Sequence, residues 1–442
     1  MQALGGPEVE GRAGRSPGMR DFALRSGPEQ AGPRGPEIAA AVAAAPLARP
    51  ERGASANPSG GADVVFTYSY VSWQAAAARG WFMPEDRLAR ALVDHERIGR
   101  LLVADLMRSL PAKLARDSVA RVRGGSYPFP SSDRVKLVSP VRMRREYPTS
   151  IPAIERACAR YERVLRREAE AMGMSRPAVI TANPLLAGFG RFGWAGPVTF
   201  FATDDWLAYP LHERWWPAYE ESFRLVRERE RRVCAVTAAA LERIDPSGPA
   251  LVVPNGLDPS EWEDPAGEPP AWAGEARRPL LLYVGSLDSR LDIPALGALA
   301  AALPDAEIAL VGPLLDAAHL APLAAHPNVS IHPPVGREEV TALVRSADVG
   351  LIPHVSSELT RAMSPLKLYE YLAGGLPVVA ADLGPVRGVS EAVTLVQAGG
   401  GYAKGAKAAL RRGRSAEEER IAFIAANSWQ ARQGALLDLA LD

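Results

Sequence analysis

The strongest constraint on the fold of this chain is a repeated alternation of short, continuous apolar runs with amphipathic stretches of helical length. Between residues 62 and 258 the apolar runs lie in "ADVVFTYSYVSW", "IGRLLVADL", "PAVITAN" and "GPVTFFATDD", and a second series lies in "LLLYVGS", "AEIALVGP", "NVSIHPP", "ADVGLIPH" and "LPVVAADL". Such Val/Ile/Leu runs are typical of parallel strands covered by helices on both faces. The Pro/Gly/Glu-rich segment "GEPPAWAGEARRP" separates the series. The pattern predicts an α/β protein with two doubly wound, Rossmann-like domains facing a shared cleft.

Shifts in composition predict the domain boundaries. The first 60 residues are rich in Gly, Pro, Ala and Arg, so they bury too little apolar surface to offset the entropy of ordering and are predicted to be a disordered tail. The remaining predicted parts are a first domain (61–258), a linker (259–278), a second domain (279–414) and a C-terminal helical segment that crosses back to the first domain (415–442).

Charge and cysteine content exclude several classes of protein. The 51 Lys and Arg residues balance 51 Asp and Glu residues, which gives no argument for a nucleic-acid partner. Cys158 and Cys234 are the only cysteines, so neither a disulfide framework nor a zinc site is indicated. No apolar run approaches the roughly 18 residues that a spanning helix needs. These features predict a cytoplasmic protein, with peripheral contact at the inner face of the membrane as an open alternative.

The stretch "SPLKLYEYLAGGLPVVAAD", residues 364–382, carries the clearest functional signal. Ser364 is a natural N-cap, Pro365 a natural first helical residue, and Gly374 a natural helix end. Lys367 then falls at the third helical position, where a capping box carries Glu or Gln. A cation there opposes the helix dipole unless an anion binds at that end.

A diphosphate would supply that anion. Free N–H groups near Ser364, Pro365 and Leu366, together with Lys367, predict a diphosphate site. Glu370 lies one turn further along the same face, where its carboxylate can accept hydrogen bonds from both hydroxyls of a ribose. The alternative is a surface Lys–Glu pair worth a few tenths of a kcal/mol, which does not explain why these charges interrupt an otherwise apolar helix.

At this point the sequence resembles the GT-B-fold glycosyltransferases of group 1, which include members that build teichuronic acid. The resemblance covers about residues 61–442 and is strongest over 280–382. Its marks are "VVPNGLD" (252–258), "YVGSLDSRLD" (283–292), "NVSIHPPVGREEVTALVRSADVGLIPH" (328–354), "SPLKLYEYLAGGLPVVA" and "NSWQARQGALLDL" (427–439).

The resemblance implies roles for individual residues. It implies that Glu370 binds the ribose, that Arg290 and the turn from Ser364 to Lys367 bind the diphosphate, and that the loop near Val335 holds the base. Many members carry a second glutamate eight residues before the ribose-binding one; here that position is Ala362, and Glu358 is the nearest acid.

Three further residues follow strands of the second series. Gly285 and Ser286 could let the backbone approach the phosphates. His354 ends the strand "DVGLIPH", at the carboxyl end where ligands bind, and is predicted to contact the sugar, with a hydrogen bond inside a loop as the alternative. Arg290 could equally be a solvated arginine at a helix start.

The first domain offers candidates for the acceptor side. Asp204 and Asp205 follow the strand "VTFFA", and each could act as a base toward an acceptor hydroxyl or cap the next helix. The segment from Arg108 to Arg145 holds ten Arg/Lys against two Asp/Glu, which suits an anionic acceptor or a membrane surface, although a solvated face is the simpler interpretation. "GFGRFG" matches GxGxxG but leads into a strand rather than opening a helix, so a dinucleotide site is not predicted there.

The sequence thus predicts an enzyme that transfers a sugar from a nucleoside diphosphate, with UDP favoured, to an acceptor hydroxyl of a glycan, glycolipid or small molecule. No cofactor other than this co-substrate and no metal are predicted, and the resemblance favours retention at the anomeric carbon. Asp204, Asp205, Lys367 and Arg290 are the predicted catalytic residues. The alternatives are a sugar-nucleotide epimerase of the same fold and a non-catalytic partner protein that resembles a glycosyltransferase.

Overall fold

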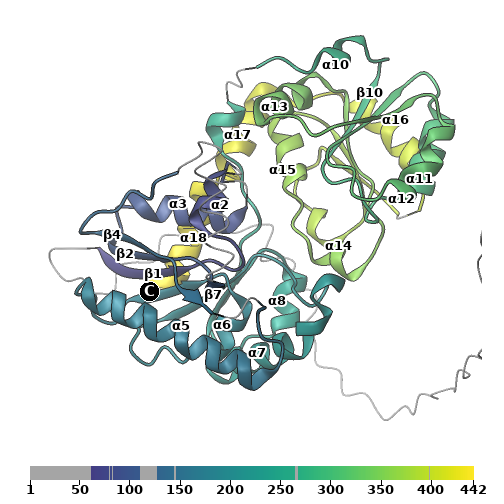
Figure 1. The fold of residues 1–442 in the computed structure, drawn as a ribbon. Coiled ribbons are helices and arrows are strands. Elements are labelled where there is room, and N and C mark those ends of the chain that lie inside the picture. The colour runs from purple at the N-terminus through teal and green to yellow at the C-terminus, as the bar shows by residue number, and fades with distance from the viewer. Residues whose placement is uncertain are drawn as a thin grey trace, which may run out of the picture. The chain divides into compact units, whose positions relative to one another are not determined.

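A computed structural model describes residues 61–442 of the chain, apart from 79, 82, 110–126, 144–145, 264–266 and 398 (Figure 1). The predicted tail over residues 1–60 lies outside the described residues. Much of the basic segment between Arg108 and Arg145 lies outside them as well.

The first sheet has seven strands that all pair in parallel. In spatial order they are β4 (Val135–Val138), β2 (Ile98–Ala104), β1 (Ala62–Thr67), β6 (Ala178–Thr181), β7 (Val198–Ala202), β8 (Arg232–Ala235) and β9 (Ala250–Val252). A separate parallel pair is formed by β3 (Arg108–Ser109) and β5 (Val141–Arg142).

The second sheet has six strands, again all parallel. In spatial order they are β12 (Val329–His332), β11 (Glu307–Val311), β10 (Leu280–Val284), β13 (Val349–Ile352), β14 (Val378–Ala381) and β15 (Val393–Val396). The expected fold of two doubly wound sheets is therefore confirmed. The exact domain boundaries stay predictions.

Helices cover both faces of each sheet, as uninterrupted apolar strands require. The elements around the first sheet are α2 (Trp73–Ala78), α3 (Pro84–Asp94), α5 (Ile151–Ala171), α6 (Pro184–Phe189), η1 (Pro210–Trp215), α7 (Trp216–Glu228), α8 (Ala238–Ile244) and α18 (Trp429–Leu441). In β1, Val64 and Phe66 belong to a core shared with α2, α3 and α18, whereas Val65 belongs to the core shared with α5, α6 and α7 on the other face (Figure 1).

The second sheet is covered in the same way. The remaining elements are α9 (Pro259–Trp262), α10 (Ala271–Glu275), α11 (Ile293–Ala302), α12 (Ala317–Leu320), η2 (Ala321–Ala325), α13 (Arg337–Ser346), α14 (Glu358–Ala362), α15 (Leu366–Ala373), η3 (Gly384–Val386), α16 (Tyr402–Arg412) and α17 (Glu417–Ala426). In β10, Leu282 packs toward α13 and α15, and Leu281 packs toward α11 and α16.

Each sheet has one point where the strand order reverses direction. In the second sheet it lies between β10 and β13, because the chain leaves β10 toward β11 on one side and leaves β13 toward β14 on the other. Loops at the carboxyl ends of two such strands diverge and leave a crevice, which is where open α/β sheets bind ligands. The motif "YVGSLDSRLD" begins at the end of β10, and His354 follows β13.

The junction motif "VVPNGLD" contacts the second sheet's helices. The backbone N–H of Asn255 donates to Ser364 Oγ (3.2 Å) and its side-chain amide donates to the Ser364 carbonyl (2.8 Å). Thr237 Oγ1, at the start of α8, donates to the Ala362 carbonyl (2.9 Å). These bonds tie the segment leaving β9 to the turn before α15, and the start of α8 to the end of α14.

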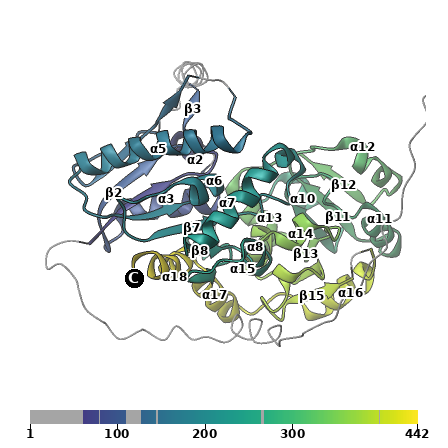
Figure 2. The same ribbon diagram turned by 90° about the horizontal axis from the view of Figure 1, so that it is seen from below.

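The last helix, α18, packs on the first sheet although it follows α17 of the second (Figures 1 and 2). Leu436 and Leu437 are fully buried in the core that contains Phe66 and Phe201. Arg232 donates to the Leu439 carbonyl (2.8 Å), which helps to hold the helix against β8.

Replacing Leu437 with Ala tests this packing. The substitution leaves a cavity in a closed core, so we expect a loss of about 2–5 kcal/mol in the free energy of unfolding, measured by urea titration. Gln430→Ala, at an exposed position of the same helix, is the matched control. Equal midpoints for the two variants would contradict the docking of α18.

Candidate functional site

The turn after β10 brings the backbone close to Lys367. Gly285 has φ of +149°, which favours glycine, and a Cβ built on it would lie 2.5 Å from Lys367 Nζ and 3.2 Å from the Tyr283 hydroxyl. The backbone angle therefore favours glycine here, and a side chain would displace the Lys367 ammonium from its position. The contact is with the ammonium group that the sequence assigns to phosphate binding.

The start of α15 differs from the prediction. The helix begins at Leu366, and Ser364 does not cap it, because its hydroxyl accepts the N–H of Asn255 at the junction. Lys367 is consequently the second helical residue, not the third. The predicted end is confirmed, since Gly374 is the C-cap and Gly375 has φ of +74°.

Lys367 sits in an environment that disfavours its charge. Its Nζ lies 3.9 Å from the centroid of the Tyr283 ring, a cation–π contact. Burial, followed by the neighbouring Arg290, lowers the pKa of Lys367 from 10.5 to about 7, against the smaller opposing effects of Glu370 and Asp288. Among the described residues Lys367 forms no ion pair. An anion at this position would relieve the penalty.

Arg290 is held by the loop that follows Gly285. Its guanidinium forms a bidentate ion pair with Asp288, with Nε 2.9 Å from Oδ1 and Nη2 2.7 Å from Oδ2. Asp288 therefore orients the guanidinium while neutralising part of its charge. His354 is almost fully buried nearby, with Nε2 3.5 Å from the Tyr283 hydroxyl. Burial, Lys367 and Arg290 together hold the pKa of His354 well below its usual range, so the imidazole is neutral.

Glu370 lies one turn along α15 from Lys367, with one carboxylate oxygen in an ion pair. Oε1 accepts from Arg337 Nη1 at 2.5 Å, and within the described part of the chain no hydrogen bond to Oε2 is found. Arg337 is the first residue of α13. Val335, the predicted base-binding residue, lies two positions earlier, in the loop between β12 and α13, and is partly buried.

The two adjacent acids after β7 have different environments. Asp205 is buried, forms an ion pair with Arg243 (2.8 Å) and accepts the backbone N–H of Leu207 (3.1 Å), so its contacts are structural. Asp204 accepts a hydrogen bond from the Tyr209 hydroxyl (3.2 Å). Burial raises the pKa of Asp204 to about 6, and Arg290 is among the charges that oppose this rise. Asp204 is thus within electrostatic reach of the Arg290 site.

The structure brings five of the predicted site residues together. Convergence at the ends of β10, β13 and the start of α15 places Gly285, Ser286, Arg290, His354 and Lys367 in one cluster. At the position where many family members carry glutamate, the Ala362 side chain is buried and its carbonyl accepts from Thr237, while Glu358, the nearest acid in the sequence, is exposed and pairs with Arg243 (3.3 Å).

Sequence reasoning missed four contributors. Tyr283 makes the cation–π contact with Lys367 and lies beside His354. Asp288 forms an ion pair with Arg290, and Arg337 forms one with Glu370. The hydroxyl of Tyr209 donates a hydrogen bond to Asp204. Asp288 could have been found, because an acid two residues before an arginine after a strand-ending glycine can close a loop. No local signal marks the Arg337–Glu370 pair, which joins residues 33 positions apart.

Other features do not add to this cluster. Gly188 and Gly190 of "GFGRFG" lie at the end of α6, and their carbonyls accept from Arg229, so the rejection of a helix-opening fingerprint agrees with the structure. No group of three or more His, Cys, Asp or Glu side chains in the described residues is placed to hold a metal ion. Across the same residues, no helix is long and apolar enough to cross a membrane.

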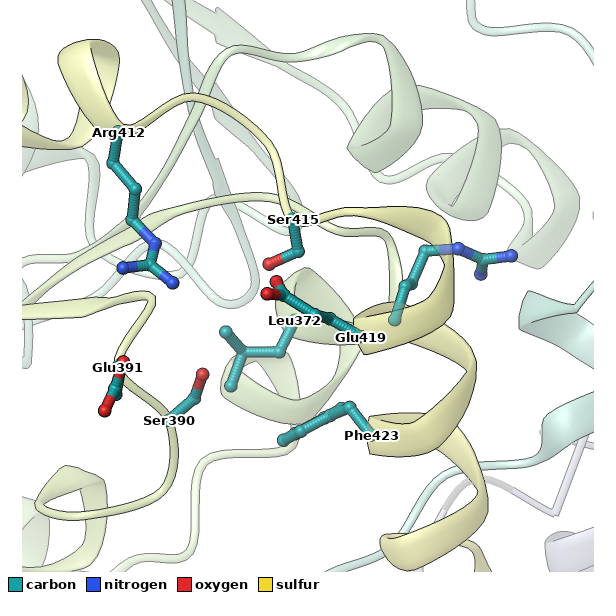
Figure 3. Close-up of a pocket in the computed structure, with 8 residues that line it drawn as sticks. Leu372, Ser390, Glu391, Arg412, Ser415, Glu419 and Phe423 are labelled. Carbon is teal, nitrogen blue, oxygen red and sulfur yellow. The ribbon is translucent and has the colours of Figure 1, made fainter.

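A pocket of about 220 Å³ lies at the other end of α15. In Figure 3 the side chains of Ser415 and Glu419 point toward each other, beside Leu372 and Phe423. None of the predicted donor-site residues lines it, so it is separate from the cluster around Lys367.

The region of the second sheet is similar to known proteins. Residues 278–412 match the family described as "Glycosyl transferases group 1". A 108-residue stretch is 33% identical to TuaH of Bacillus subtilis (strain 168), a protein named for a glycosyltransferase role in teichuronic acid biosynthesis. That match spans 24% of this chain and 27% of TuaH.

Solved structures are similar over most of the chain. Sucrose-phosphate synthase from Thermosynechococcus elongatus superposes with a TM-score of 0.60 at 16% identity, covering 85% of this chain and 98% of that one. A trehalose-phosphate synthase from Burkholderia vietnamiensis gives 0.60 at 14% identity, covering 86% and 97%. At these identities the likeness establishes the fold, which is GT-B.

The pH dependence of stability tests the environment of Lys367. The unfolded chain keeps this proton up to about pH 10.5 and the folded one releases it near 7, so this residue destabilises the fold increasingly as pH falls from about 10 to 7. Lys367→Met should therefore gain about 1–3 kcal/mol over the wild type at pH 6, a figure reduced for partial exposure, and little at pH 10. Lys404→Met, at an exposed position of α16, is the control. A pH-independent difference would contradict the assignment.

Proposed function

We propose, for a chain in which residues 278–412 form a domain of the glycosyl transferases group 1 family, that the protein transfers a sugar from a nucleoside diphosphate to an acceptor hydroxyl. The observation that carries this proposal is the convergence of Lys367, Arg290 and the amino end of α15 at the strand reversal of the second sheet. Gathering two cations at the positive end of a helix is unfavourable without an anion. A diphosphate is the anion that this arrangement fits.

The nucleoside would extend along α15. Glu370 is one turn beyond Lys367, and its carboxylate can accept from ribose hydroxyls. Val335 would then lie near the base. UDP is our choice of nucleotide because the group 1 resemblance favours it, and polysaccharide biosynthesis is a fitting role given what TuaH is named for.

The chemistry would rest on stabilising the leaving group. The bond between the anomeric carbon and the diphosphate oxygen breaks while a bond to the acceptor oxygen forms, so negative charge grows on the diphosphate. Lys367, Arg290 and the N–H groups of α15 are fixed near that charge before the reaction, which is preorganised electrostatic stabilisation. Neutral His354 would face the sugar without adding a third cation.

Asp204 would serve the acceptor. Its pKa of about 6 leaves it ionised at pH 7 but basic enough to take the proton of an acceptor hydroxyl. Asp205 is already engaged by Arg243, so Asp204 is the stronger candidate of the pair. The resemblance favours a product that retains the configuration at the anomeric carbon. We propose that outcome together with metal-independent transfer, with the acceptor oxygen attacking from the face that the diphosphate leaves; attack from the opposite face would give inversion.

Nucleotide binding tests the proposed donor site. In a thermal-shift panel of UDP, GDP, dTDP, CDP, ADP and NAD, UDP should raise the melting temperature most, since a ligand at 100 times its Kd adds about 2.7 kcal/mol. Glu370→Ala should weaken UDP binding about 10- to 100-fold by removing a charged acceptor, whereas Glu338→Ala, exposed on α13, should not. No shift with any nucleotide would favour the non-catalytic partner.

Substitution of Asp204 tests its proposed role as the base. Asp204→Asn should lower the rate of UDP release from a UDP-sugar about 10²- to 10⁴-fold while changing the Kd for UDP less than about twofold. In the wild type that rate should fall as pH drops below about 6, because Asp204 is then protonated. The measurement uses a panel of UDP-hexoses with water or a sugar as acceptor. An unchanged rate would remove Asp204 from the mechanism, and conversion of the UDP-hexose to its epimer would indicate an epimerase.

A further inference from the structure

A chain of alternating charges leads from Glu370 to the first sheet's helices. Arg337 donates to Glu370 through Nη1 (2.5 Å) and to Glu261 Oε2 through Nε (2.8 Å) and Nη2 (2.6 Å). The other oxygen of Glu261 accepts from Arg87 Nη2 at 2.8 Å. Arg87 Nη1 in turn donates to Asp258 at 2.7 Å.

The five residues come from four places in the chain. Arg87 belongs to α3, Asp258 and Glu261 to the start of α9, Arg337 to the start of α13 and Glu370 to α15. The side chains of Arg87 and Glu370 are each 12% exposed, so solvent screens these pairs only in part. The guanidinium of Arg337 also lies 5.5 Å from the centroid of the Trp262 ring.

These contacts fix the guanidinium of Arg337 in one orientation. Nε and Nη2 are both directed to one oxygen of Glu261, the Trp262 ring lies beside the group, and only Nη1 reaches Glu370. A planar guanidinium held at two of its nitrogens has little freedom in the third. The position of Glu370 Oε1 is therefore set by residues that lie outside α15.

We propose that Arg337 is a positioning residue that holds the Glu370 carboxylate for the two hydroxyls of a ribose, and that Glu261 and Arg87 hold Arg337 in turn. This inference rests on the proposed function. If Arg337 has this role, the preference for ribose over 2′-deoxyribose depends on the whole charge chain from Arg87 to Glu370 and not on Glu370 alone. Released from Arg337, Glu370 samples other rotamers and loses the alignment that a pair of adjacent hydroxyls requires.

The experiment compares UDP with 2′-deoxy-UDP by isothermal titration calorimetry. In the wild type, UDP should bind more tightly than the deoxy analogue. Arg337→Ala should weaken UDP about tenfold and the deoxy analogue only about two- to threefold, so that the ratio of the two affinities falls. Arg337→Lys, which keeps the charge but lacks the planar fork, should also lower the ratio.

Glu261→Gln separates positioning from net charge. Removing this carboxylate makes the region more positive, so a purely electrostatic effect would tighten the binding of a diphosphate. Loss of positioning lowers the ratio of UDP to deoxy-UDP affinity instead, and this is the result we expect. Arg345→Ala, at an exposed position of α13, is the matched control and should leave the ratio unchanged.

The outcomes distinguish the inference from the proposed function. If Glu370→Ala binds UDP as the wild type does, the ribose site itself is wrong. If Glu370→Ala weakens UDP but Arg337→Ala and Glu261→Gln keep the wild-type ratio, the positioning role is overturned. Tighter UDP binding by Arg337→Ala would also overturn it, because Arg337 would then compete with the ribose. Urea titration of each variant shows whether it is folded, and Arg337→Lys tests the role if the alanine variant is not.

Discussion

The placement of Lys367 at the positive end of α15 is the constraint on which the rest of the site depends. The dipole, Arg290 and burial all oppose its charge, and the aromatic face of Tyr283 offsets only part of this cost. Several neighbouring features are consequences of that placement. Gly285, whose positive φ favours glycine, leaves room for the ammonium beside it, and the ion pair of Asp288 with Arg290 offsets part of the second cation's charge. The strand reversal between β10 and β13 provides the crevice itself.

The contacts between the two halves converge on the same helix. Asn255 engages the backbone and hydroxyl of Ser364 immediately before α15, and Thr237 engages Ala362 two residues earlier. The charge chain through Glu261 and Arg337 reaches α15 from its other side at Glu370. The diphosphate end and the ribose end of the proposed donor site are therefore each braced by residues from outside the second sheet. An altered contact between α3 and α9 would change the ribose end without touching a ligand.

Most of the second sheet and its cluster could be predicted from the sequence, and the reason is physical. A buried parallel strand can be recognised in the sequence as a continuous apolar run, and a glycine or a charged residue directly after it marks the carboxyl edge of the sheet. One edge strand of each sheet was missed: β4 ("VKLV") is short and half polar, and β15 ("VTLV") is only partly buried. The capping role of Ser364 was wrong because capping was inferred locally, whereas a partner 109 residues away takes its hydroxyl. Arg337 was missed for the same reason, since no pattern within α13 distinguishes it from a solvated arginine.

The two adjacent acids show how structure divides residues that sequence treats alike. Both follow β7 and both could cap or catalyse, yet Asp205 forms an ion pair with Arg243 (2.8 Å) whereas Asp204 accepts a hydrogen bond from the hydroxyl of Tyr209. Burial raises the pKa of both carboxyls; Arg243 opposes the rise at Asp205, and the Tyr209 hydroxyl opposes it at Asp204. The pKa of Asp204 is about 6, so its protonation can change near neutral pH, and Arg290 is among the groups that act on it. Because Arg290 also belongs to the cluster around Lys367, the charge of a diphosphate at the proposed donor site would raise the pKa of Asp204 further and, in the proposed mechanism, strengthen it as a base.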